Sequence, residues 1–486
     1  MTETTRPNVL LICTDHWGGL LTRRAGHPTV MTPTIDQLSR CGVTFTNAYT
    51  ACPSCIPARR SLMTGTSART HGDRVFNERA EMPALPTMAQ CFRDAGYQAI
   101  AVGKLHVHPQ RDRIGFDEVI LNEEGRHHLG DLAADDWEMH LADHGFAGQE
   151  YASDLNNNDY VTRAWHLPED CHSTNWTAAQ MCRAIHRRDP RKPGFWYMSF
   201  VGPHPPVWPL QAYLDLYHDV KLDEPVMGEW VRDPASLPHA LRAYPSDGGD
   251  AVRTGLPHEI DLSRRAFYAT ITHIDHQIRV VIGYLREQGL LDNTILAFTA
   301  DHGDMLGDHG RWGKTVLYEM SAKVPLVVVP RKGDERMPVN TDDARLAELR
   351  DIMPTLLDLA GLPIPPSVEG LSLLRDQRRA HLYGEHWEGD LAWRMVRDDR
   401  YKLIYYAVGN RRQLFDLQND PRETRDLTAG PAHTDHLECL TQLLIAELYG
   451  GDEAWVRDGK LIGLPDKPAK PKLDRGLSGQ RGIRFI

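Results

Sequence analysis

The stretch NVLLICTDHW, residues 8–17, is an apolar run that leads directly into an aspartate and a histidine. A short apolar run bounded by polar residues is typical of a strand buried on both faces of a parallel sheet. Open sheets of this kind bind their ligands beyond the carboxyl ends of the strands. The stretch therefore predicts a buried strand over residues 8–14 and places Asp15 and His16 at a functional edge.

Three further apolar runs lead into polar residues in the same way. They are YQAIAVG before Lys104 and His106, YMSFVGP before His204, and ILAFTA before Asp301 and His302. Helical patterns lie between the runs, such as residues 32–42, where Thr32 is expected to be the N-cap and Gly42 to follow the last turn. Because the carboxyl ends of parallel strands share one edge, we expect these four strand ends to converge on one pocket.

The alternation of strands and helices predicts an α/β fold over residues 1–375, a large and mostly parallel sheet sandwiched between helices. From about residue 376 the pattern changes to alternating apolar residues and turn dipeptides, which predicts a smaller antiparallel C-terminal subdomain over 376–460. The last stretch, 461–486, is rich in Pro, Lys and Arg. It is either an extended tail or an arm on a neighbouring subunit, which would make the protein a homo-oligomer.

The composition limits the classes of function. The net charge of −11 argues against general binding to nucleic acid or to anionic membranes. The N-terminal sequence lacks the basic start and long apolar segment of a signal peptide, and no stretch reaches transmembrane length, so a cytoplasmic location is expected. The cysteines are scattered, several within apolar runs, which favours buried thiols over a disulfide framework.

Residues 47–65, NAYTACPSCIPARRSLMTG, hold two cysteines three positions apart, Cys52 and Cys55. A redox pair would open a helix of a small βαβ domain, and a zinc site would need a second CxxC or paired histidines. The surrounding sequence offers neither context. The motif that begins at Cys55 is different: C-x-P-x-R from Cys55 to Arg59, followed by TG, resembles the signature of type I sulfatases. In that family the cysteine is oxidised after translation to formylglycine. Cys52 falls outside this motif and is expected to be a buried thiol.

The resemblance extends over nearly the whole chain. The family's elements are matched in order by NVLLICTDHW, TPTIDQLSRCGVTFTNAYT, GYQAIAVGKLHVH, GPHPPVW, FTADHGDMLGDHGRWGKTVLYE, VPLVVVP, DIMPTLLDLAGLP, VEGLSLL and QLFDLQNDPRETRDL. Residues 110–270 and the final tail are the least recognisable. The chain is thus similar to the formylglycine-dependent sulfatases of the alkaline phosphatase superfamily, and nearest to the choline-sulfatase and phosphonate monoester hydrolase branch, because His follows Asp301. The implied fold is alkaline-phosphatase-like.

The resemblance implies hydrolysis of an organic sulfate monoester to an alcohol and inorganic sulfate. One hydroxyl of the hydrated formylglycine attacks sulfur, and deprotonation of the other expels sulfate, so that no water has to attack the sulfur. A divalent metal ion lowers the pKa of the attacking hydroxyl. The implied partners are a small-molecule sulfate ester and a formylglycine-generating maturation enzyme.

The resemblance also assigns roles to individual residues. Arg59 would hold the diol, Lys104 and Lys314 would neutralise sulfate oxygens, His106 would be the base, and His204, with or without Lys314, the acid. The implied metal ligands are Asp15, His16, Cys55, Asp301 and His302. His16 stands where many relatives carry Asp or Gln, so it is either a ligand that suits manganese better than calcium or a group that orients a neighbour.

Three alternatives stay open. The same site could hydrolyse a phosphonate monoester or phosphodiester, although the cationic pair Lys104 and His106 favours sulfate. A two-metal phosphatase would need a further Asp/His set, for which Asp308 and His309 are the candidates. A relative that has lost maturation would keep Cys55 as a thiol and bind an anion or a partner.

Overall fold

The computed structural model describes residues 6–124, 134–150, 152–153, 155, 158, 160–243 and 256–468. Its main feature is an eight-stranded sheet with the order β4-β3-β5-β1-β6-β7-β2-β8. The strands are β1 Asn8–Thr14, β2 Val43–Tyr49, β3 Gln98–Gly103, β4 Glu118–Leu121, β5 Gly194–Ser199, β6 Thr294–Ala300, β7 Leu326–Val329 and β8 Thr341–Glu348. Pairing is parallel except on the two sides of β7, which runs antiparallel to β6 and β2. The predicted α/β fold with a mostly parallel sheet is confirmed.

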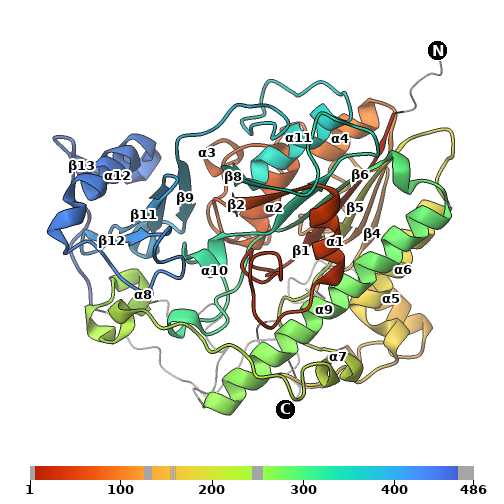
Figure 1. Ribbon diagram of the computed structural model, residues 1–486, viewed down its shortest axis with the longest axis horizontal. Helices are drawn as coiled ribbons and strands as arrows, with labels where there is room; N and C mark the ends of the chain where they lie inside the picture. Colours follow the sequence, from red (N-terminus) through yellow and green to blue (C-terminus); the bar gives the residue numbers. More distant parts are fainter. Residues whose placement is uncertain are drawn as a thin grey trace.

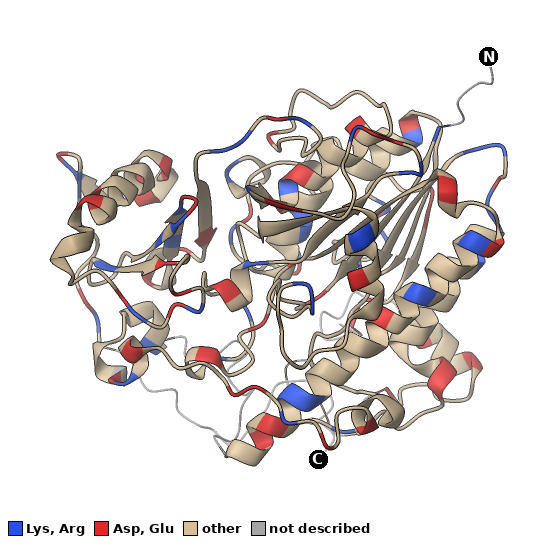
Figure 2. Ribbon diagram, viewed as in Figure 1, with Lys and Arg blue, Asp and Glu red and all other residues tan. Residues whose placement is uncertain are grey.

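Helices cover both faces of this sheet (Figure 1). One group contains α1 Pro33–Cys41, α5 Asp136–Asp143, α6 Ser173–His186, α7 Gln211–Asp215 and α9 Pro257–Glu287, and the other contains α2 Cys55–Thr64, α3 Ala68–His71, α4 Met88–Asp94 and α11 Ile352–Leu359. Shorter helices α8 His239–Ala243 and α10 Glu319–Ala322 lie in the connections. The central strands are almost free of charged residues, which gather on loops and outer helix faces (Figure 2). Among the described residues, none of the helices has the length and apolar character needed to cross a bilayer.

A second sheet is built by the C-terminal part of the chain. Its antiparallel strands, in the order β12-β11-β10-β9, are β9 Leu382–His386, β10 Trp393–Arg397, β11 Tyr401–Tyr406 and β12 Arg411–Asp416. Helix α12, Thr434–Glu447, packs on this sheet, and a short hairpin of β13 Val456–Arg457 and β14 Lys460–Leu461 follows. The predicted antiparallel C-terminal unit is therefore present.

The start of the predicted tail lies on the second sheet. The N–H of Leu464 donates to the carbonyl of Ala407 at 2.8 Å, and Leu464 packs among the partly buried residues of this sheet. Residues 469–486, on which the expected subunit contact would rest, lie outside the described residues.

Hydrogen bonds join the second sheet to loops of the larger unit that lie close to the ends of the central strands. The N–H of Glu385 in β9 donates to the carbonyl of Ala51 at 2.8 Å, and the indole of Trp393 in β10 donates to the carbonyl of Thr315 at 2.7 Å. Ala51 precedes α2, and Thr315 follows Lys314. Two segments that carry predicted site residues are thus held by the same C-terminal sheet.

Helix α1 has the expected position but a different cap. The Thr32 side chain does not cap the helix; its hydroxyl accepts a bond from the N–H of Arg23. The Asp275 carboxylate of α9 instead accepts from the N–H groups of Thr34 and Ile35, both at 2.9 Å. Two of the free N–H groups at the start of α1 are thus satisfied by a residue far away in sequence, which ties α1 to α9.

Gly42 follows α1 as predicted, but with an extended rather than left-handed backbone. A Cβ at this position would lie 2.1 Å from the carbonyl oxygen of Val328 in β7. The glycine is therefore required by the close approach of β7, and not by a left-handed helix cap.

We predict that Asp275→Ala lowers the free energy of unfolding by about 1–3 kcal/mol, because it leaves two buried N–H groups without an acceptor. Asp275→Asn should cost less. The asparagine keeps one acceptor oxygen and removes a buried negative charge. Burial disfavours that charge in the unsubstituted protein, where it raises the pKa of Asp275 to about 6. Urea denaturation at pH 7 measures both values. Equal losses in the two variants would contradict the capping role.

Candidate active site

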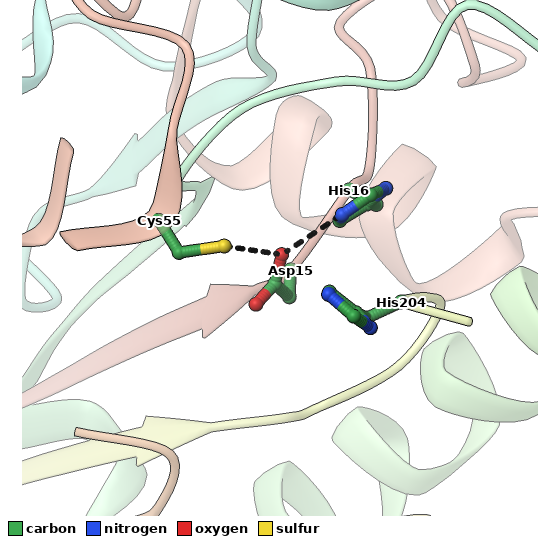
Figure 3. Close-up of side chains that lie close together, drawn as sticks. All are labelled: Asp15, His16, Cys55 and His204. Carbon is green, nitrogen blue, oxygen red and sulfur yellow. Dashed lines mark hydrogen bonds and ion pairs between the residues drawn. The ribbon is translucent and has the colours of Figure 1, made fainter. Parts of the chain in front are cut away.

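The strands that precede the predicted site residues are neighbours in the sheet, in the order β3-β5-β1-β6. Their carboxyl ends therefore share one edge, and the structure brings together there Asp15, His16, Lys104, His204, Asp301 and His302. All of these side chains are buried, and those of Asp15, Lys104, Asp301 and His302 are fully excluded from solvent. Figure 3 shows Cys55, His16 and His204 arranged around Asp15.

Cys55 is the first residue of α2, and its Sγ lies 3.3 Å from Nε2 of His302 and 3.8 Å from Oδ1 of Asp15. Ser54 precedes the helix in an extended conformation, so the N-terminus of α2, with its partial positive charge, faces the cluster. Burial, reinforced by the charge of Asp15, raises the pKa of the Cys55 thiol to about 11. An unmodified Cys55 is therefore a protonated thiol at neutral pH and a poor nucleophile.

Arg59 lies one turn further along α2 and is almost completely buried. Its Nε donates to Oδ2 of Asp301 at 2.9 Å, and a terminal nitrogen donates at 2.9 Å to both the Lys104 carbonyl and the Ser199 hydroxyl. A buried guanidinium needs this degree of pairing to offset its loss of hydration. Arg59 thus fixes α2, and with it Cys55, relative to the strand ends.

The donor set suits a divalent metal ion. The potential ligand atoms of Asp15, Cys55, Asp301 and His302 all lie within 4.8 Å of one another. Burial lowers the pKa of His302, which keeps its imidazole in the neutral form that binds metals. Two buried carboxylates and a neutral imidazole are ligands for calcium, manganese or a similar ion, so the residues present fit the metal that the sequence implies. A second set, formed by Asp15, His16, Cys55 and His204, overlaps the first.

His16 is held between two polar partners. Its Nδ1 lies 2.7 Å from Oδ2 of Asp304, and its Nε2 lies 2.7 Å from Nζ of Lys314. An ammonium group can only donate, so Nε2 of His16 is the acceptor and Nδ1 donates to Asp304. In this arrangement His16 can orient Lys314, and it also belongs to a group of potential metal ligands with Asp15 and Cys55. Asp304 was missed from the sequence, although it stands in the same DHGD segment as Asp301.

Lys314 also lies 3.2 Å from Nε2 of His204, whose Nδ1 faces the carbonyl of Pro205 at 2.5 Å. By the same reasoning Nε2 of His204 accepts from Lys314, and Nδ1 carries the proton. Burial, followed by the charge of Lys314, lowers the pKa of His204 well below its usual value. Lys314 therefore donates hydrogen bonds to both His16 and His204. His204 lies on the side of Asp15 away from Cys55 (Figure 3).

Lys104 forms ion pairs with Asp15 and with Glu124. Glu124 also lies 3.9 Å from Nε2 of His204. It was missed because it belongs to the part of the chain with the weakest resemblance. His106 follows on the same loop, its N–H bound by the carboxylate of Glu123 at 2.9 Å and its ring packed edge-on against Phe76.

The residues that a two-metal phosphatase would need are engaged elsewhere. Asp308 accepts a bond from the N–H of Val226 at 3.0 Å and pairs with Arg422, and Nδ1 of His309 accepts from the N–H of Gly228 at 3.0 Å. They hold the 226–228 loop and are not part of either cluster at the strand ends. Cys52 is a buried thiol, as expected, with a pKa raised well above its usual value by burial and by Glu385.

The second sheet contributes one more imidazole. His386, the last residue of β9, is fully buried, and neither of its ring nitrogens has a hydrogen-bond partner in the described part of the chain. Burial, with Arg394, His302 and Lys314, lowers its pKa to about 3. The sequence does not indicate a role for His386, because nothing in it shows that β9 lies next to the metal-ligand candidates.

The fold and site can be compared with known proteins. Residues 7–362 match the family model described as Sulfatase, and residues 307–448 match that of N-sulphoglucosamine sulphohydrolase, C-terminal. The chain is 35% identical to an arylsulfatase of Clostridium perfringens, covering 94% of this chain and 97% of that protein. It is 29% identical to a choline-sulfatase of Rhizobium meliloti over 88% of this chain and 83% of that protein.

Solved structures agree on the fold. The phosphonate monoester hydrolase of Agrobacterium radiobacter superposes with a TM-score of 0.78 at 23% identity, covering 91% of this chain and 95% of that one. The fold is thus that of the alkaline-phosphatase-like hydrolases. Within this class the chain belongs to the sulfatase family, and it is a sulfuric ester hydrolase.

We predict that metal-depleted protein gains stability from a divalent cation, because a cation offsets the repulsion between the buried carboxylates of Asp15 and Asp301. Calcium or manganese at a hundred times its Kd should contribute about 2.7 kcal/mol. Differential scanning calorimetry with and without chelator measures the shift in melting temperature. Asp301→Asn should abolish the shift, whereas Asp376→Asn, at a side chain that is 98% exposed, should retain it. A shift of equal size in both variants would place the cation elsewhere.

Proposed function

We propose that the protein hydrolyses a small organic sulfate monoester with a nucleophile made from Cys55 by oxidation to formylglycine, together with one bound divalent metal ion. The observation that carries the proposal is the position of Cys55 at the start of α2, with Sγ 3.3 Å from His302 and 3.8 Å from Asp15. The raised pKa of the thiol supports it, since the unmodified side chain would be almost entirely protonated. The match to the sulfatase family supports sulfate as the group that is removed.

Asp15, Asp301 and His302 would hold the metal together with the modified Cys55. When bound, the metal supplies Lewis acidity that lowers the pKa of a hydroxyl on the modified side chain. Arg59, through its bonds to Asp301 and to the Lys104 loop, keeps the nucleophile in line with the ester. The N-terminus of α2 favours an anionic group at the same place.

Lys104, which pairs with Asp15, and Lys314, which donates to His16, would neutralise the sulfate oxygens. His204 and the ammonium of Lys314, joined by a hydrogen bond, would act together as the general acid. A proton of the pair would pass to the departing oxygen as the bond to sulfur breaks, and His204 would hold the ammonium in place. His106 would remove the proton that releases sulfate in the second step.

A phosphonate monoester or phosphodiester is the second candidate substrate, since such esters also carry a single negative charge. The similarity in fold to the phosphonate monoester hydrolase of Agrobacterium radiobacter favours it. The pairing of a lysine with a histidine at positions 104 and 106 favours sulfate, as does the higher sequence identity to the arylsulfatase.

The modification of Cys55 can be tested directly by mass spectrometry of the tryptic peptide Cys41–Arg59 from protein made in its own host. We expect an aldehyde in place of the Cys55 thiol, with Cys52 unchanged in the same peptide as the internal control. Cys55→Ala should be inactive although folded. A Cys55 that is entirely thiol in active protein would contradict the formylglycine mechanism.

Substrate preference can be tested by measuring kcat/KM for an aryl sulfate and for the matching aryl phosphodiester. We expect the sulfate to be preferred, and Lys104→Ala to lower its kcat/KM by about 100- to 1,000-fold, because a donor to the developing negative charge is lost. Lys192→Ala, at an exposed position before β5, is the control and should leave kcat/KM unchanged. A preference for the diester by orders of magnitude would favour the second candidate.

A further inference from the structure

A second group of potential metal ligands lies where α5 meets the short helical turn Glu169–Cys171 before α6, and it shares no residue with the clusters at the strand ends. It consists of His140 in the last turn of α5, His144 directly after the end of that helix, and Cys171. One ring nitrogen of each histidine and the Sγ of Cys171 lie within 4.8 Å of one another. Helices α5 and α6 are at the lower right of Figure 1.

The hydrogen bonds of the two histidines leave one nitrogen of each ring free for a metal. Nδ1 of His144 faces the carbonyl of His140 at 2.8 Å, and Nε2 of His140 faces the carbonyl of Asp170 at 3.3 Å. A carbonyl can only accept, so each of these nitrogens carries the proton, and the other nitrogen of each ring keeps its lone pair. Histidines that bind metals are commonly oriented by such a bond from the second nitrogen to a backbone carbonyl.

The ligand types indicate which metal would bind. The spacing of His140 and His144 is the i, i+4 spacing that presents two imidazoles on one face of a helix. One thiolate and two imidazoles suit Zn²⁺ better than calcium or magnesium. Asp170, whose Oδ2 lies 3.9 Å from Nε2 of His144, can supply the fourth ligand that a tetrahedral site requires.

A structural role for the two histidines without a metal is less well supported. Their rings lie 4.1 Å apart at the C-terminal end of α5, where a protonated histidine would interact favourably with the helix dipole. That role needs a charge, whereas burial and the neighbouring His144 lower the pKa of His140. The helix dipole also does not account for the cysteine sulfur beside the two imidazoles.

We propose that His140, His144 and Cys171 form a zinc site, with Asp170 or a water molecule as the fourth ligand, separate from the catalytic metal. Binding forms two nitrogen–metal bonds and one sulfur–metal bond, and the thiol proton of Cys171 is released to solvent without any change of oxidation state. Zinc affinity therefore falls as the pH is lowered. The metal joins α5 to the turn that precedes α6.

This link continues toward the catalytic loop. The Asp135 carboxylate, the N-cap of α5, accepts from the N–H of Glu123 at 2.6 Å. The carboxylate of Glu123 in turn binds the N–H groups of Leu105 and His106. Zinc at the other end of α5 would stabilise this chain of contacts, so its role is structural support rather than chemistry.

The test uses Co²⁺ as a spectroscopic probe in full-length Cys55→Ser protein, which removes the catalytic thiol. We expect one equivalent of Co²⁺ to give a sulfur-to-cobalt charge-transfer band that Zn²⁺ abolishes. In this background His144→Ala should weaken Co²⁺ binding by more than about tenfold. The control His218→Ala, at a side chain that is 80% exposed, should bind as before. Cys171→Ser should lose the band altogether.

His144 is partly exposed, so its replacement should not unfold the protein, and circular dichroism can check this for each variant. The absence of the charge-transfer band in the Cys55→Ser protein would overturn the proposal, as would a band that His144→Ala leaves unchanged. Neither result depends on hydrolysis of any ester. Failure of the zinc site and failure of the proposed function are therefore distinguishable.

Discussion

The interaction on which the rest of the site depends is the pairing of one buried guanidinium with the ends of four strands. Arg59 donates to Asp301 after β6, to the Lys104 carbonyl after β3 and to Ser199 at the end of β5, and it lies 3.5 Å from Asp15 after β1. A charge in this position is tolerated only when each of these partners is in place. Arg59 therefore couples the position of the helix that carries Cys55 to the positions of the strand ends and the two carboxylates.

The C-terminal sheet completes this assembly from outside. It holds Ala51, just before α2, and Thr315, next to Lys314, through hydrogen bonds to β9 and β10. The first of these positions leads into the helix that carries Cys55, and the second follows Lys314, which contacts His204. Their geometry is set by a sheet formed much later in the chain, so the smaller unit has a direct part in shaping the site.

Much of this arrangement could be predicted from the sequence, because it follows from local patterns. The strand over 8–14, the polar residues at four strand ends and the C-x-P-x-R frame at Cys55 are all readable without a structure. The partners that join distant segments could not be predicted. Asp275 caps α1 from another helix, and Glu124 pairs with Lys104 from a stretch with little resemblance to the family. Such contacts are fixed by packing, which leaves no periodic signal in the sequence.

Cys55 itself is only 1% exposed, and the C-terminal sheet closes over the segment just before it. In the folded chain an enzyme that modifies this thiol would have no access to it. Residues near the N-terminus leave the ribosome first and remain accessible until β9 and β10 have been made and docked. If Cys55 is oxidised as proposed, the burial of this one side chain imposes an order of events, in which the oxidation comes before folding is complete.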